Sequence, residues 1–141
     1  MQSDIFYNKT VTVFNQYMED GPTGGECWQA TVLNNVRLIE TQGANISKSG
    51  ISGADSASLY IRTNTLEKEY KEPREWSRLE DKTDSFTLAK DTDFFVCGDM
   101  AAEYTGQADF FNFMKENFDG VYKITTVDRY DLIPHLEVGG K

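Results

Sequence analysis

The sequence is poor in the residues that build metal centres and catalytic clusters. Its 141 residues include one histidine and two cysteines. Cys27 and Cys97 lie far apart, and neither belongs to a Cys-x-x-Cys or Cys/His motif. A structural zinc site needs four closely spaced ligands, so this composition excludes one. We interpret both cysteines as buried thiols, because a disulfide would require an oxidising compartment that no other feature of the sequence indicates.

Long apolar runs and a basic surplus are also missing. No stretch approaches the roughly 18–20 apolar residues of a membrane span, and the opening MQSDIFYNKT has no basic and apolar signal pattern. We therefore expect a soluble, intracellular protein. The net charge is −9, from 23 acidic and 14 basic residues. Such a chain repels phosphate backbones, so we expect no specific nucleic-acid binding, although an acidic surface suits a protein that lets DNA pass.

The residues that are present favour a β fold. Hydrophobic residues make up 39% of the chain and aromatic residues 13%, which is enough for one core. Alternating apolar and polar residues predict strands at 9–17 and 57–64, and a longer strand at 27–40 with a bulge at Asn34-Asn35. The run Phe94–Cys97 is apolar on both faces, as in an interior strand. Two closing strands are predicted at 121–130 and 135–140.

One principal helix is predicted near residues 107–117. Its large apolar residues follow a helical spacing: Phe110, Phe111, Phe113, Met114 and Phe118. Thr105 is a candidate N-cap, and Gly120 lies just past the end. Such a helix needs an apolar bed, so we expect it to pack across an open sheet or to plug one end of a barrel. The chain is thus predicted to be one mainly β domain, residues 1–141, a small β-barrel or sandwich with this helix.

Two segments are predicted to be exposed and to contact other proteins. The first, at about 43–56, is small, polar and rich in glycine, and the second, at about 65–85, is highly charged. From these segments we choose the following candidate interface residues: Lys48, Ile51, Tyr70, Arg74 and Trp76. Trp76 is the expected anchor, and the alternative, in which it covers the core of its own domain, stays open. Edge strands and mobile excursions commonly join neighbours by strand addition or arm exchange.

The tail ITTVDRYDLIPHLEVGGK, residues 124–141, holds the single histidine, His135. A catalytic histidine needs an orienting acid and a nucleophile or substrate within reach. Pro134 separates His135 from Asp131 on any helix, and Glu137 offers only a solvated pair on the same strand face. We interpret His135 as a surface or interface residue, and the acidic clusters at 81–84, 90–93 and 127–131 as solvated turns. We therefore predict no enzyme, with no catalytic, cofactor or metal residues.

Several pieces of the chain resemble small prophage-encoded proteins of Gram-positive bacteria whose genes lie among head–tail joining genes. The resemblance runs from about residue 10 to the end. It is carried by WQATVLNNVRL, GANISKSGISGADSASLYI, PREWSRL, KDTDFFVCG, YKITTVD and HLEVGGK. These pieces form a pattern of strands and turns and contain no catalytic signature.

This resemblance implies a structural role in the phage neck, as a head-completion (stopper), head–tail joining or tail-completion protein. Such proteins are small β-barrels that form a ring around the DNA channel. It implies that the partners are other phage head–tail proteins and further copies of the chain, without membrane contact, in the virion or the bacterial host cytoplasm. Two alternatives stay open: a small ligand- or carbohydrate-binding β module that groups Tyr60, Trp76 and Tyr104, and a hydrolase built on His135.

Overall fold

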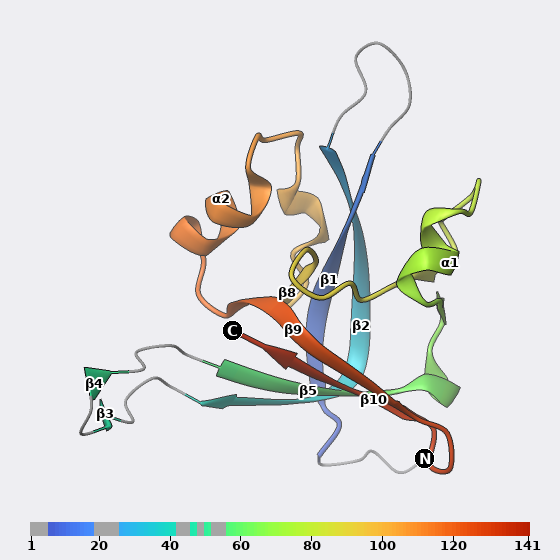
Figure 1. Ribbon diagram of the computed structural model, residues 1–141, viewed down its shortest axis with the longest axis horizontal. Coiled ribbons are helices and arrows are strands. Elements are labelled where there is room, and N and C mark those ends of the chain that lie inside the picture. The colour runs from blue at the N-terminus through green and yellow to red at the C-terminus, as the bar shows by residue number, and fades with distance from the viewer. Residues whose placement is uncertain (1–5, 19–25, 42–45, 48–49, 52–55) are drawn as a thin grey trace.

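Six antiparallel strands close into a barrel in the computed structural model, which describes residues 6–18, 26–41, 46–47, 50–51 and 56–141 (Figure 1). Around the barrel the order is β1-β2-β5-β10-β9-β8. The barrel strands are β1 (Lys9–Met18), β2 (Glu26–Thr41), β5 (Ser56–Arg62), β8 (Phe94–Cys97), β9 (Val121–Tyr130) and β10 (His135–Gly140). The prediction of a mainly β fold with two closing strands at the C-terminal end is confirmed.

Short elements join these strands. Two small pairs are formed by β3 (Ile46–Ser47) with β4 (Gly50–Ile51) and by β6 (Glu69–Tyr70) with β7 (Ser85–Phe86). The helices are α1 (Pro73–Ser77), α2 (Phe110–Asn117) and two single 3-10 turns, η1 (Thr63–Thr65) and η2 (Ala101–Glu103). No helix in the described part of the chain is long and apolar enough to cross a membrane.

Strand alternation divides the apolar residues between the inside of the barrel and its outer wall. On β1, Val11 and Val13 belong to the core cluster of the barrel interior, whereas Phe14 belongs to a second cluster. On β8, Phe95 belongs to the first cluster and Phe94 to the second. All five side chains are fully buried, as the run of apolar residues on both faces of β8 predicts. The barrel interior is therefore a packed core and not a channel.

The second cluster explains the position of α2. Phe110 and Met114 of this helix are fully buried against Phe14, Phe94 and Trp28 on the outer wall of the barrel. The ring centroids of Phe110 lie 5.0 Å from Phe14 and 5.7 Å from Phe94. Burial of each such ring contributes roughly 1.5–3 kcal/mol. The helix thus covers the side of a closed barrel, and the expectation of an open sheet or an end plug was wrong.

The limits of the helix also differ from the prediction. It begins at Phe110, with Asp109 as N-cap, so the assignment of Thr105 as the cap was wrong. From the apolar spacing of this helix we also predict that Phe111 and Phe118 are largely buried. They are only half-buried, at the edge of the second cluster, so this prediction was wrong for both. The left-handed backbone of Asp109, with φ of 52°, starts the helix abruptly and leaves only eight helical residues.

The predicted bulge in the long strand is confirmed. Asn35 has a φ of 58°, a left-handed conformation that asparagine tolerates better than most residues. The register between β1 and β2 shifts at this point. After it, Val36 still pairs with Lys9 of β1, and residues 37–41 then pair with β5. The bulge therefore forms a corner at which the long strand turns from one side of the barrel to the next.

The charged segment at 65–85 is anchored in the fold. Pro73 occupies the first turn of α1, where a proline is tolerated, and the short helix turns Trp76 toward β1. Trp76 is only 2% exposed, and its ring lies 6.3 Å from that of Tyr17. The expectation of an exposed Trp76 at an interface was wrong, and the alternative, in which it covers its own core, is confirmed. Most of the loop at 43–56 lies outside the described residues.

Candidate interaction site

The hairpin that joins β9 to β10 exposes large apolar side chains at its tip. Leu132 is 96% exposed and Ile133 is 73% exposed, while Tyr130 at the end of β9 is 45% exposed. In Figure 1 this hairpin extends beyond the barrel at the lower right, away from α2. A turn at a barrel end is usually polar, and adjacent apolar side chains that no described residue covers are typical of a surface that contacts another molecule.

His135 holds this tip in place. Its ring stacks on Tyr130, with 4.8 Å between centroids and 10° between the ring planes. Nδ1 lies 2.6 Å from the carbonyl oxygen of Ile133, and Nε2 lies 2.9 Å from a carboxylate oxygen of Glu137. Because both partners accept hydrogen bonds, the doubly protonated ring satisfies both at once. The bond to Glu137, followed by the bond to the Ile133 carbonyl, raises the pKa of His135.

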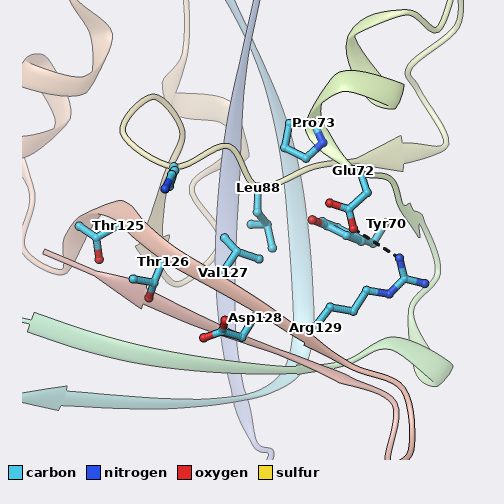
Figure 2. Close-up of a pocket in the computed structure, with 10 residues that line it drawn as sticks. Tyr70, Glu72, Pro73, Leu88, Thr125, Thr126, Val127, Asp128 and Arg129 are labelled. Atoms are coloured by element: carbon cyan, nitrogen blue, oxygen red, sulfur yellow. Dashed lines mark hydrogen bonds and ion pairs between the residues drawn. The ribbon is translucent and has the colours of Figure 1, made fainter.

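A groove of about 400 Å³ lies next to this hairpin, along β9 (Figure 2). One wall is residues 125–129 of β9, and the other is Tyr70, Glu72 and Pro73 at the start of α1. Leu88 and Lys90 also line it. The interpretation of the tail as closing strands alone therefore missed both features of this region, the apolar tip and the groove.

One ion pair connects the two walls of the groove, and a tyrosine hydroxyl lies in one wall. Arg129 Nη1 lies 3.4 Å from a carboxylate oxygen of Glu72 (Figure 2). Arg129 Nε also lies 3.5 Å from a carboxylate oxygen of Asp131. Both members of the first pair are more than half exposed, so the pair contributes little to stability. Burial, together with the nearby carboxylate of Glu72, raises the pKa of Tyr70 to about 12. Its hydroxyl therefore stays protonated and can donate a hydrogen bond.

A buried carboxylate fixes the loop behind the groove. Asp93 is 1% exposed and accepts three hydrogen bonds, from the backbone N–H of Gln16 at 3.0 Å, from that of Ala89 at 2.9 Å and from Asn15 Nδ2 at 2.8 Å. Asn15 Oδ1 also accepts a bond from the N–H of Thr87, at 3.2 Å. Burial raises the pKa of Asp93 to about 6, and the three donors oppose this shift. The interpretation of Asp93 as part of a solvated turn was wrong, because this residue leads directly into the interior strand β8.

The remaining acidic turns and the cysteines fit a structural interpretation. Asp81, Asp84 and Asp128 are exposed, as the prediction of solvated turns requires. Both cysteines keep their thiols but are half-buried rather than buried. Burial and the neighbouring carboxylate of Glu40 raise the pKa of Cys97 to about 11, so this thiol is not a nucleophile at neutral pH.

The other candidate residues are not gathered into one site. Tyr60 lies beside Arg37, Trp76 beside Tyr17, and Tyr104 packs on Phe110 at 4.8 Å between ring centroids. The three aromatics of a ligand module thus belong to different parts of the fold. Among the residues whose placement is described, no group of three or more His, Cys, Asp or Glu side chains is arranged to hold a metal ion.

The five predicted interface residues have different outcomes. Tyr70 is half-buried in the groove wall, Arg74 is exposed on α1 and Trp76 is buried. Lys48 lies outside the described residues, and of Ile51 only its place in β4 is described. Sequence reasoning missed Leu132 and Ile133. The signal in the sequence was their position between an aspartate and a proline, which favours a turn. Side chains in such a turn do not lie on the buried face of a strand or helix.

The chain belongs to a family of unknown function (DUF6751), whose profile matches residues 6–141. No curated protein and no solved structure matches it.

Proposed function

We propose that this protein is a non-enzymatic structural component of a phage head–tail connector and that its copies form a ring around the DNA channel. The observation that carries the assembly role is the apolar tip of the β9–β10 hairpin. Leu132 is 96% exposed and Ile133 is 73% exposed, while His135 stacks on Tyr130 and hydrogen-bonds the Ile133 carbonyl, so these contacts brace the turn. A preordered apolar turn loses little conformational freedom when it docks, so this arrangement favours protein binding.

The polar groups of the molecule support a structural role over catalysis. Both ring nitrogens of His135 lie within hydrogen-bond distance of acceptors, and the carboxylate of Asp93 accepts bonds from three N–H donors. A general acid or base must instead present its titrating atom to a substrate. These two residues therefore act on the conformation of the hairpin and of the loop behind the groove.

The phage assignment rests on the resemblance of the sequence and on charge. A net charge of −9 per chain, multiplied around a ring, gives a lumen that repels the DNA backbone. Because the barrel interior is filled by side chains, the DNA channel of this proposal is the space enclosed by several subunits. The same repulsion between subunits favours a monomer or weak oligomer in isolation, with the ring formed on a partner that supplies compensating contacts.

The test is deletion of the gene from an inducible lysogen, followed by electron microscopy of the released particles. We expect DNA-containing heads without attached tails, and restoration of tailed particles by the wild-type gene supplied in trans. The protein should also be found by mass spectrometry in purified virions. Tailed, infectious particles from the deletion strain would contradict the proposal.

A further inference from the structure

One edge of β9 has no partner strand among the described residues over the second half of its length. β8 pairs with β9 only at residues 121–123. Ile124 then exchanges backbone hydrogen bonds with Asp91 and Asp93, at 2.7 and 3.0 Å. From Thr125 to Tyr130, the only strand beside β9 in the described part of the chain is β10.

The register identifies which backbone groups face the open side. Lys123 and Lys141 exchange both backbone hydrogen bonds, at 3.1 and 2.9 Å, so Lys141 faces β9. In an antiparallel pair this orientation alternates along the strand. In steps of two back from Lys141, Gly139, Glu137 and His135 of β10 also face β9. Their partners on β9 are Thr126, Asp128 and Tyr130. Val127 and Arg129, which lie between these three, therefore direct their N–H and C=O groups away from β10.

These groups open into the groove of about 400 Å³ described above. Within the part of the chain that the structure describes, no backbone hydrogen bond reaches Val127 or Arg129 from that side. The opposite wall, Tyr70 to Pro73, stands across from them (Figure 2). Because this wall stands beside the open edge, a single extended chain matches the groove better than the edge of a folded sheet does.

We propose that this groove binds an extended segment of another protein, which adds to β9 as a strand and pairs with the backbone of Val127 and Arg129. Strand addition obtains affinity from main-chain hydrogen bonds and specificity from alternate side chains. Inward-facing side chains of the segment would meet Leu88 and Val127, so they should be β-branched or apolar. At the Thr125 end, Lys90 has no hydrogen bond or ion pair with any described residue and favours an acidic residue there. This site goes beyond the proposed neck role, because it is argued without reference to the phage.

The groove can admit such a segment at little cost. The ion pair between Arg129 and Glu72 links its two walls, and both side chains are more than half exposed. Exposed pairs of this kind contribute about 0–1 kcal/mol, so their separation does not oppose binding strongly. Arg129 would then be able to pair with the segment itself.

The test uses the purified full-length protein and a synthetic probe, the acetylated and amidated peptide Glu-Thr-Val-Thr-Val-Thr-Lys. A second peptide with every internal amide N-methylated has the same side chains but cannot pair as a strand. We expect the first peptide to slow amide hydrogen exchange at Val127 and Arg129 and to bind on the order of tenfold or more tightly than the second. Equal binding of the two peptides, or no binding at millimolar concentration, would overturn the inference.

Substitution of Val127 on the open edge of β9 provides a second, independent test of strand addition. Val127→Pro removes one N–H on the open side and leaves the pairing with β10 in place, whereas Val127→Thr keeps that N–H and a β-branched side chain. We expect the first variant to lose peptide binding and the second to keep it, and equal binding by both would contradict strand addition. If Val127→Pro does not fold, the N-methylated peptide still decides the question. Leu132→Ser should bind the peptide normally, so failure of this site is distinguishable from failure of the neck proposal.

Discussion

The charged segment around α1 and the apolar tip of the β9–β10 hairpin use their large side chains in opposite ways. The segment carries many charges, yet its Trp76 is 2% exposed. The tip is short and uncharged at its two central residues, yet Leu132 is 96% exposed. Apolar area that is buried stabilises the folded monomer, whereas exposed apolar area contributes favourable free energy only when a partner covers it. The segment therefore contributes to the stability of the domain, and we propose that the tip contributes to its interactions.

The largest expected effect concerns the segment. Trp76→Ala should lower the free energy of unfolding by about 3–5 kcal/mol, the range for removal of a buried aromatic side chain. We expect a value in the lower half of this range, because the buried indole Nε1 has no hydrogen-bond partner among the described residues and therefore already costs stability. Urea denaturation measures the change, with Arg74→Ala on the exposed side of the same helix as the control. Equal stability of the two variants would place Trp76 outside the core.

The second prediction concerns Asp93, which holds the loop behind the groove to β1. Its pKa in the folded protein is about 6 instead of 3.8, so folding binds a proton between these values. The contribution of Asp93 to stability is therefore greatest below about pH 4 and falls as the pH rises to about 6. A shift of this size corresponds to about 3 kcal/mol.

The measurement for Asp93 is the difference in unfolding free energy between wild type and Asp93→Asn from pH 4 to 7. Relative to the variant, the wild type should lose stability from pH 4 to about pH 6 and keep a constant stability above that. A constant difference would mean that the three N–H donors keep the pKa of Asp93 near its ordinary value. Asp128→Asn, at an exposed position on β9, is the matched control.

The third prediction concerns the order of the tip. The pKa of His135 is raised above 6.5 by Glu137 and the Ile133 carbonyl, with Arg62 as its neighbour on β5. Its contribution is fully present below pH 6.5 and is lost as the pH rises through the raised pKa. The protection factor of the Ile133 amide, which corrects for the intrinsic pH dependence of exchange, should therefore be highest in mildly acidic buffer and fall as the pH rises through the pKa of His135. NMR titration should show a lower His135 pKa in Glu137→Gln, and an unchanged pKa would remove the proposed support of the tip.

The smallest effect is expected at the tip itself. Leu132→Ser should change the free energy of unfolding by no more than about 0.5 kcal/mol, because the side chain is 96% exposed. Urea denaturation beside Trp76→Ala sharpens the contrast between the two regions. A loss of more than about 1 kcal/mol would show that Leu132 contributes to the core.

Local patterns predicted much of the fold. The bulge at Asn35, the buried strand at Phe94 and the helix at Phe110 all follow from short-range features, namely turn preference and apolar periodicity. The closure of the barrel does not, because it depends on pairing between distant strands such as β1 with β8 and β5 with β10. A single sequence contains no direct signal of such pairs.

The candidate site was less predictable for the same reason. Trp76 has charged neighbours on both sides, and only the helix that starts at Pro73 turns it inward. Conversely, Leu132 and Ile133 look like strand residues until the turn is placed at 131–134. The open edge of β9 arises because β8 is short, which can be seen only after the two strands are paired.

The central claim, that the hairpin tip docks the protein in a head–tail assembly, is tested most directly by complementation of the gene deletion with Leu132→Ser/Ile133→Ser. Met18→Ser, which changes another apolar residue that is 70% exposed, is the matched control. The count of tailed particles by electron microscopy should fall about tenfold or more with the tip variant, as for loss of an interface hot spot. It should stay normal with the control, while both proteins unfold at the wild-type urea concentration. Full restoration of tailed particles by the tip variant would contradict the account.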